Sequence, residues 1–385
     1  MFRSKRTLLS SVVAGTMFLS LAIGGPALAK KYEADMYVAG MGGHFADAKI
    51  VVDPDKDTPI TITELSKIDI GDGDTHPTHD ARIDNKDRNI MYWSTYKLDK
   101  DGGSVTHVGK TDLSSEEIIT DTSVKTPEKV LNSSKMYCGS GQTDSFYMPI
   151  TMSKPGYVSV IDKKTMQVKH QIFFEGTDAD PGVPYKFIHG TTSPDGSEFF
   201  ITFNESDSPN SSKEYGNTVG KMHMVVLDTK AMEKGQVKVL RKGIATGNKK
   251  STVSFRQYYS PDGNYIANAS GDILFIIDTK TLKVLDAETA KPLDQFHDAM
   301  FTPDSKYVVV TSRNKRIKEG VTPKDPKKPA NTEFLMDGTL NVYDMKAGAF
   351  IGKATSACLA CHDKELGTGE DAVHAVLCGI DANWK

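Results

Sequence analysis

Several features are scarce or absent in this chain of 385 residues, and each absence narrows the range of functions. The formal net charge is only -3, which argues against general nucleic-acid binding. Four cysteines are too few for a fold built on disulfides. No nucleophile–base pair, phosphate loop or paired-carboxylate motif stands out, so hydrolase and nucleotide-dependent functions have little support. After residue 23 no apolar run approaches the length of a membrane span, and we expect a soluble mature protein.

The N-terminus has the three parts of a secretory signal peptide. Residues 3–6 carry three basic side chains, residues 7–23 are apolar, and Pro26-Ala27-Leu28-Ala29 contains an A-x-A cleavage site. We predict a signal peptide over residues 1–29, with cleavage before Lys30 and a periplasmic or secreted mature chain. An uncleaved membrane anchor is the alternative, although the apolar run is just short of the ~20 residues that a span needs.

The most specific motif is C-x-x-C-H, in Cys358-Leu359-Ala360-Cys361-His362. Two thiols at this spacing can bond to the two vinyl groups of one porphyrin, while the next residue places an imidazole under the iron. We therefore predict one covalent haem c, with Cys358 and Cys361 as thioethers and His362 as the proximal iron ligand. Export suits this prediction, because proteins with c-type haem are assembled outside the cytoplasm, on the periplasmic side in Gram-negative bacteria.

The same cysteines also fit a zinc site. Cys358, Cys361, His374 and Cys378 have the spacing C-x2-C-x12-H-x3-C, which is that of a zinc knuckle. Haem is favoured over zinc because the zinc interpretation leaves the adjacent His362 without a role. Plain disulfides are the third interpretation.

A repeat runs through the mature chain, and its mark is a short β-branched run that ends in Asp before a Lys-rich turn. Weaker copies end at Asp53 and Asp112, and successive Asp marks are 50 to 66 residues apart. The clear copies are Val158-Ser159-Val160-Ile161-Asp162, Val225-Val226-Leu227-Asp228, Phe275-Ile276-Ile277-Asp278 and Asn341-Val342-Tyr343-Asp344. A second mark is a turn between two runs of strand-forming residues, in Ser193-Pro194-Asp195-Gly196, Ser260-Pro261-Asp262-Gly263 and Thr302-Pro303-Asp304-Ser305. Four antiparallel strands in each period of roughly 40–50 residues are typical of a β-propeller blade.

This pattern resembles the YVTN or YncE-like propellers and, more loosely, the propellers of cytochrome d1-type enzymes and of quinohaemoprotein amine dehydrogenase β-subunits. The resemblance covers nearly the whole mature chain, and it implies the fold far better than the function. We predict an all-β, six-bladed propeller over residues 30–385; seven blades, the usual number in that family, are the alternative. Insertions at 205–218 and 313–337, both between the second and third strands of a unit, explain the longest intervals.

The C-terminus is predicted to close the ring. The first unit begins at Met36-Tyr37-Val38-Ala39-Gly40 and lacks an inner strand, whereas residues 374–381 repeat the pattern of residues 297–304. We expect the C-terminal strand to complete the first blade and so remove the open edges. The haem motif then lies in an insertion, residues 354–373, before that strand. Only 23 residues follow His362, far too few for a separate cytochrome c domain.

Histidines recur at the starts of the predicted inner strands, namely His79, His189, His297 and His374. In two other units Cys138 and Arg256 take about the same place. Polar residues here commonly bond neighbouring blades across the channel, which is the structural alternative. The functional hypothesis is a ring of imidazoles that supplies a distal haem ligand, a catalytic acid–base group or a second metal site. His76 and His44 could join this ring.

Three further features concern the haem and its surroundings. Cys138 and Cys378 would form a disulfide in an oxidising compartment, or would face the channel as metal-binding thiolates. No methionine follows His362, so a methionine ligand would come from elsewhere, such as Met336. The basic segment Lys315 to Lys328 is either a solvated loop or a docking site for an acidic redox partner.

Two functions follow from these features. The first is a periplasmic protein with one c-type haem, acting as an electron carrier or as an oxidoreductase whose haem serves a site in the channel mouth. The second is a non-catalytic binding or scaffold propeller, in which the haem or a zinc ion is a structural staple. A redox partner protein is expected for the first, and no nucleic-acid partner for either.

Overall fold

The computed structural model describes residues 30–40, 42–73, 75–95, 105–130, 137–152, 154–208, 218–292, 294–317, 322, 324, 334–357 and 378–385, without the side chains of 314–317 and 334–337. The predicted signal peptide and the C-x-x-C-H motif lie outside the described residues, as does His374.

The described chain is built almost entirely of antiparallel β-strands, which confirms the predicted all-β class. One sheet combines the two ends of the chain, in the order β24 (Ile380–Trp384), β1 (Tyr32–Ala39), β2 (His44–Val52), β3 (Ile60–Asp69). The next three sheets follow the chain order: β4 (Thr78–Ile83), β5 (Ile90–Thr95), β6 (Val105–Asp112), β7 (Glu117–Lys125); β8 (Tyr137–Gln142), β9 (Phe146–Thr151), β10 (Tyr157–Asp162), β11 (Val168–Phe173); β12 (Tyr185–Thr192), β13 (Glu198–Ser206), β14 (Thr218–Asp228), β15 (Val239–Thr246).

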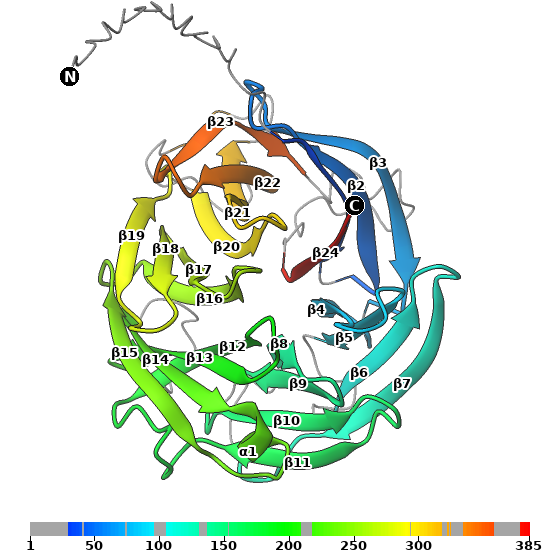
Figure 1. The fold of residues 1–385 in the computed structure, drawn as a ribbon, viewed down its shortest axis with the longest axis vertical. Helices are drawn as coiled ribbons and strands as arrows, with labels where there is room; N and C mark the ends of the chain where they lie inside the picture. The colour runs from blue at the N-terminus through cyan, green and yellow to red at the C-terminus, as the bar shows by residue number, and fades with distance from the viewer. Residues whose placement is uncertain are drawn as a thin grey trace, which may run out of the picture.

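The last sheet has eight strands in two runs of four. They are β16 (Thr252–Tyr259), β17 (Tyr265–Gly271), β18 (Ile273–Asp278), β19 (Val284–Thr289) and β20 (Asp294–Phe301), β21 (Tyr307–Ile317), β22 (Phe334–Asp344), β23 (Ala349–Ser356). A single pairing, Gly271 with Phe296, joins the two runs. The sheets stand around a common centre in a propeller-like ring, with the first strand of each run innermost and the fourth at the rim (Figure 1).

The repeated Asp residues stabilise the turns that follow them. The Asp162 carboxylate accepts the N–H groups of Lys164 and Thr165 at 3.0 and 2.8 Å, and the other clear copies of the repeat accept turn N–H groups in the same way. In the second type of turn, the Ser193 hydroxyl donates to Asp195 at 2.5 Å, and Gly196 has a φ of +67° that favours glycine. The carboxylates and hydroxyls of these turns therefore end the strands at regular intervals along the chain.

Apolar side chains between neighbouring sheets hold the ring together. One core cluster joins the two ends of the chain, with Ile380 and Val38 packed among buried residues of β20, β21 and β22. Another lies between the third and fourth sheets around Phe199 and Phe203. The core is thus distributed between the sheets, and the inner strands are left to carry the polar residues of the centre.

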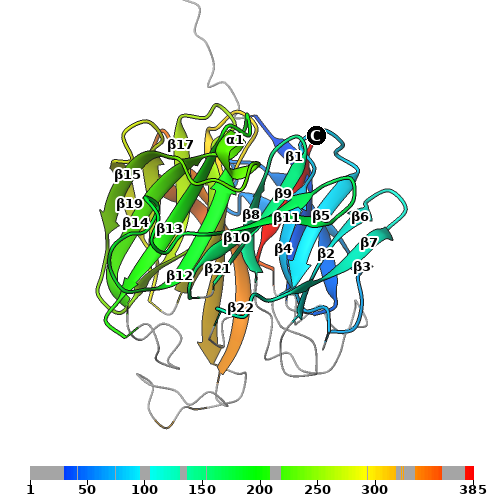
Figure 2. The ribbon, with the colours of Figure 1, turned by 90° about the horizontal axis from the view of Figure 1, so that it is seen from below.

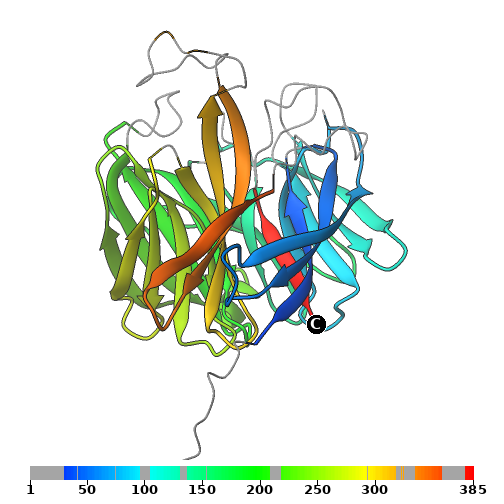
Figure 3. The same cartoon turned by 90° about the horizontal axis from the view of Figure 1, so that it is seen from above.

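Three strand bounds extend beyond what the repeat pattern indicates. Asp381 lies within β24, where it pairs with Tyr37 and its carboxylate accepts the Ile83 N–H. Strand β23 runs to Ser356. The insertion at 313–337 begins as an extended hairpin, because β21 and β22 stay paired as far as Ile317 and Phe334 and protrude from one face (Figures 2 and 3). Local composition did not show these extensions, since pairing with a partner strand decides them.

Helical structure is nearly absent from the described ranges. The short α1 (Thr229–Met232) follows β14 and has its N-terminus capped by the Asp228 carboxylate. Within those ranges no helix has the length and apolar character to cross a bilayer.

Candidate functional site

The two ends of the segment that carries the C-x-x-C-H motif are firmly anchored. Before it, the Ala357 N–H donates to the Gly338 carbonyl at 2.7 Å, and Ala357 is buried. After it, the Cys378 N–H donates to the Ala39 carbonyl at 2.8 Å, and the Gly379 N–H donates to the His79 carbonyl at 3.2 Å. The roles of Cys358, Cys361 and His362 stay predictions, but the chain re-enters the described structure at Cys378 and Gly379, beside the centre of the ring.

The inner strands change register where the candidate residues lie. In β4 the pairing with β5 slips between Thr78 and Asp80, so that His79 is the inserted residue. In β20 the slip between Phe296 and Asp298 leaves His297 in the same position. A β-bulge interrupts the alternation of side chains, and two consecutive residues can then face the same region. This is how both His79 and Asp80 reach the centre.

A thiol lies between two of these imidazoles. Cys138 Sγ is 2.9 Å from His189 Nε2 and 3.8 Å from His79 Nε2. His79 Nδ1 lies 2.7 Å from the carbonyl of Tyr137, in β8. Gly139, in the same strand, has a φ of +84°, a conformation that favours glycine. The structure thus brings together three sheets through His79, Cys138 and His189, each at most 3% exposed.

The third described histidine belongs to an aromatic stack. His297 stacks on Phe255 with ring centroids 4.9 Å apart, and the edge of Phe255 meets His189 at 6.4 Å. The guanidinium of Arg313 lies 5.9 Å from the centre of the Phe255 ring, and its terminal nitrogen is 3.7 Å from Cys378 Sγ. Nδ1 of His297 is buried and has no hydrogen-bond partner within the described structure.

Arg256 occupies the middle of the ring and connects sheets that are not neighbours. It donates to Asp80 Oδ1 and to the His79 carbonyl, its terminal nitrogen is 3.6 Å from Cys138 Sγ, and its Nε is 4.0 Å from Asp298 Oδ2. Asp80 and Asp298 are fully buried, and Arg256 balances them together with Arg82, whose guanidinium is 3.8 Å from Asp80. Asp298 also accepts the Ile380 N–H at 2.9 Å, which connects the network to β24.

Burial keeps the histidines and thiols of this cluster uncharged. It lowers the pKa of His79, His189 and His297 well below 6.5, and the nearby positive charge of Arg256 acts in the same direction. Burial also raises the pKa of the Cys138 thiol to about 12 and raises that of Cys378. Neutral imidazoles keep a lone pair at neutral pH, as a metal ligand requires. Both cysteines are free thiols in the structure, and the predicted disulfide between them stays untested.

Acid titration should show this burial directly. Unfolded histidine gains a proton near pH 6.5, but the folded imidazole does not, so stability contributed by each is lost as pH falls below 6.5, by up to about 1.4 kcal/mol per pH unit. His297→Leu should reduce that slope in urea unfolding between pH 6.5 and 5. Asp298→Asn should make that slope steeper. Burial raises the pKa of Asp298 to about 7, so its protonation favours the folded state between about pH 4 and 7, and the variant loses this contribution. Equal slopes in the parent and both variants would contradict this account.

Other predicted participants lie elsewhere or outside the described residues. Both ring nitrogens of His76 are engaged away from the cluster, with Thr75 at 2.8 Å and Asp121 at 2.9 Å. His44 starts β2, and its carbonyl accepts the Thr78 hydroxyl. The side chain of Met336 is not described, and of the segment from Lys315 to Lys328 only the end of β21 and residues 322 and 324 are.

The sequence did not indicate Asp80, Asp298 and Arg313 as site residues. The available signal was the shared triplet His-Asp-Ala at 79–81 and 297–299, in which the Asp is as regular as the His. In a regular strand, successive side chains lie on opposite faces, so such a His-Asp pair would not act together. The bulges remove that restriction.

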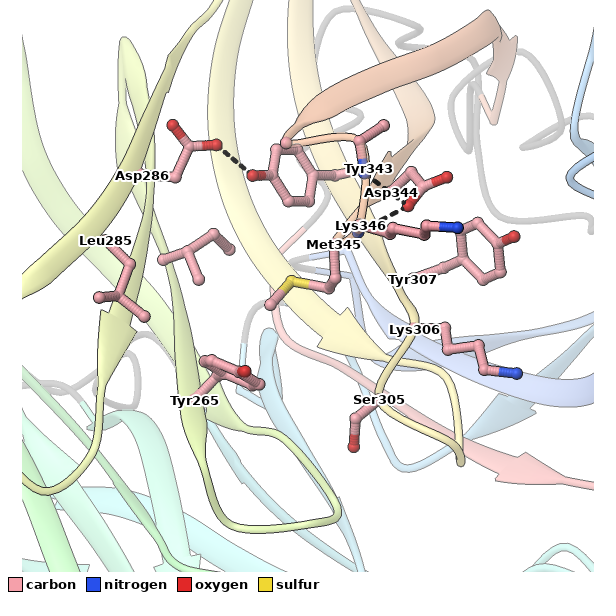
Figure 4. A pocket seen from close by; sticks show the side chains of 13 residues that line it. Tyr265, Leu285, Asp286, Ser305, Lys306, Tyr307, Tyr343, Asp344, Met345 and Lys346 are labelled. Carbon is pink, nitrogen blue, oxygen red and sulfur yellow. Dashed lines mark hydrogen bonds between the residues drawn. The ribbon is translucent and has the colours of Figure 1, made fainter.

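A groove of about 680 Å³ opens on the face of the ring opposite the protruding hairpin of β21 and β22. It lies between the turns of the last two runs of strands (Figure 4). Tyr265, Lys306 and Met345 line it, and its polar groups are largely paired: the Tyr343 hydroxyl donates to Asp286, and Asp344 accepts the Lys346 N–H at 2.7 Å. It contains no cluster comparable with that at the centre.

Comparison with known proteins gives similar folds at low similarity. No family model matches the chain, and no curated protein matches it. Among solved structures, hydrazine synthase from Kuenenia stuttgartiensis has 16% identity and a TM-score of 0.45 over 72% of this chain, which spans 65% of that one. A functionally unknown protein from Desulfotomaculum acetoxidans has 14% identity and a TM-score of 0.47, over 91% of this chain and 98% of that one. A chain of a mitotic checkpoint complex has 9% identity and a TM-score of 0.43, over 91% and 87%. Similarity this low carries no argument about function.

Proposed function

We propose that the chain is an exported redox protein with one covalent c-type haem, carried on a propeller whose six blades are closed by the C-terminal strand. The haem would be held by Cys358, Cys361 and His362, and it would supply one-electron transfer. The observation that carries this proposal is the C-x-x-C-H motif, in a segment that is followed by Cys378 and Gly379, and the Gly379 N–H donates to His79 of the buried cluster.

Six blades are supported by the six runs of four antiparallel strands, although a ring of seven stays the family alternative. Closure is supported by the pairing of β24 with β1, from Ala34 with Trp384 to Val38 with Ile380. Together these features would give the haem segment a rigid base.

The central cluster fits a haem neighbour better than an open substrate site. Its imidazoles are neutral, and His297 Nδ1 is a buried nitrogen with no hydrogen-bond partner in the described structure. His297 stacks on Phe255, which also contacts Arg313, and Arg313 reaches Cys378 Sγ. Exposed fractions of 1 to 3% for the three described histidines leave little room for a substrate among them. We therefore favour electron transfer over catalysis. A redox partner would dock near Lys315 to Lys328, at the protruding hairpin.

A second candidate is a scaffold propeller with a structural haem or zinc staple. It is favoured by the Arg256 network, which holds non-neighbouring sheets together as a purely structural device would. Its zinc form differs in expected behaviour, since a zinc staple gives no visible absorption.

Absorption spectra of the periplasmically expressed protein separate these functions. We expect a reduced-minus-oxidised difference typical of c-type haem, and a low-spin resting state if His79, His189, His297 or His374 is the distal ligand. Alanine at that ligand should give a high-spin spectrum, whereas His223→Ala, in a remote surface pair with Glu205, should change nothing. A high-spin parent that binds nitrite or peroxide would instead favour an oxidoreductase. Four alanine variants with parental spectra would leave the histidines a structural role only, and absence of haem would refute the proposal.

A further inference from the structure

A second group of potential metal ligands lies away from the centre, between the first two sheets. His76 is in the connection from β3 to β4, His107 is in β6 and Asp121 is in β7. One nitrogen or oxygen from each lies within 4.8 Å of the others. His76 Nε2 is 2.9 Å from one Asp121 oxygen, and His107 Nδ1 is 2.9 Å from the other.

The backbone determines this convergence. In the pairing of β6 with β7, His107 lies opposite Ser123, and Asp121 is two residues further along the same face of the sheet. Glycines make room for the third ligand: a Cβ at Gly71 would come within 2.6 Å of His76 Nδ1, and a Cβ at Gly109 would come within 2.1 Å of Trp93, whose edge meets His76. A side chain at either glycine would therefore displace the His76 ring or the Trp93 ring.

The hydrogen bonds around His76 suit a metal ligand. Nδ1 of His76 is 2.8 Å from the Thr75 hydroxyl, which in turn lies 3.3 Å from the Asp72 carbonyl. If Nδ1 donates to Thr75, the hydroxyl can donate onward to Asp72. In that tautomer Nε2 presents its lone pair to the Asp121 oxygen 2.9 Å away, and a cation bound between the two would satisfy both acceptors. This outer arrangement, a ligating imidazole fixed through its other nitrogen, is common at metal sites.

The access and the spacing of the group are also suitable. The histidine side chains are each 14% exposed and the Asp121 side chain 33%, so an ion can enter from solvent. Ligand atoms on adjacent corners of an octahedron with bonds of about 2.1 Å are about 3.0 Å apart. The two nitrogen–oxygen distances of 2.9 Å are close to this value, whereas the two imidazole nitrogens lie within 4.8 Å of each other.

We propose that His76 Nε2, His107 Nδ1 and the Asp121 carboxylate bind one divalent first-row transition-metal ion. Two imidazoles and one carboxylate are the protein ligands of open zinc and non-haem iron sites, in which water or a substrate completes the coordination. The site is independent of the haem, because it shares no residue with the C-x-x-C-H motif or the central cluster.

Calorimetric titration of chelator-treated mature protein with Zn²⁺ tests the proposal, in a Cys358→Ala/Cys361→Ala background that removes the competing zinc-knuckle ligands. We expect one ion per chain, and at least about a 100-fold loss of affinity in His76→Ala, His107→Ala and Asp121→Ala. The matched control is His223→Ala, since His223 is also 14% exposed and lies 2.7 Å from a carboxylate, that of Glu205, but without a second imidazole. It should bind as the parent does.

Co²⁺ in place of Zn²⁺ reports the ligand types through its visible spectrum. A nitrogen and oxygen environment without thiolate charge-transfer bands is expected. No binding by the parent, or binding that all three alanine variants retain, would overturn the proposal whether or not the protein carries haem.

Discussion

Deletion of residues 378–385 is expected to abolish cooperative unfolding of the whole ring, even though the segment with the C-x-x-C-H motif stays in the chain. The deletion removes β24, the inner strand paired with β1. It uncovers the core around Val38, from which the fully buried Ile380 is lost, and exposes the edge of β1. Burial of Ile380 alone is worth about 1.5–3 kcal/mol.

Contacts across the centre add to that cost. Asp298 loses the Ile380 N–H, the Ile83 N–H loses the Asp381 carboxylate, and Arg88 loses the Ala382 carbonyl at 2.7 Å. We expect a total loss of at least about 5 kcal/mol, comparable with the whole stability of many domains. Thermal unfolding followed by circular dichroism measures it.

Removal of Lys385 alone is the control for this deletion. Its ammonium group pairs with Asp35 at 2.9 Å at the surface, and such pairs contribute about 1 kcal/mol or less. A protein without residues 378–385 that melts cooperatively at the parental temperature would show that β24 does not close the ring.

Arg256→Met is expected to be the most destabilising single substitution at the centre, by about 3–5 kcal/mol. It removes the closer of the two cations near Asp80 and leaves only Arg82, at 3.8 Å; a buried charge that loses its partner is more costly than a buried pair. The methionine fills much of the same volume, so the loss is mainly electrostatic. Urea unfolding gives the difference in the free energy of unfolding.

A double-mutant cycle isolates that interaction. Asp80→Asn in the Arg256→Met background should recover part of the stability, because the uncompensated carboxylate is then neutral. Arg241→Met is the matched control: its pair with Glu198 is partly exposed and should be worth about 1 kcal/mol or less. If Arg256→Met costs no more than Arg241→Met, or the double variant is no better than the single one, Arg256 does not neutralise the centre.

Much of the fold could be predicted because the repeat is local. Asp162, Asp228 and Asp278 form their turns with N–H groups two or three residues along the chain, so spacing in the sequence is sufficient to find the strands. The inner position of His79, His189 and His297 follows from the same repeat.

Contacts between distant parts of the chain could not be predicted in this way. Arg256 and Asp80 are 176 residues apart, and nothing in either local sequence indicates their pairing. The bulges that turn His79 and His297 inward depend on the partner strands. His107 and Asp121 were overlooked because they lie on outer strands, where polar residues normally face solvent.

Intact mass of the mature protein, measured after denaturation, tests the central claim most directly. Thioether bonds survive unfolding, so the account predicts the mass of the chain from Lys30 plus one haem, and the apo mass for Cys358→Ala/Cys361→Ala. An apo mass for the parent would contradict it.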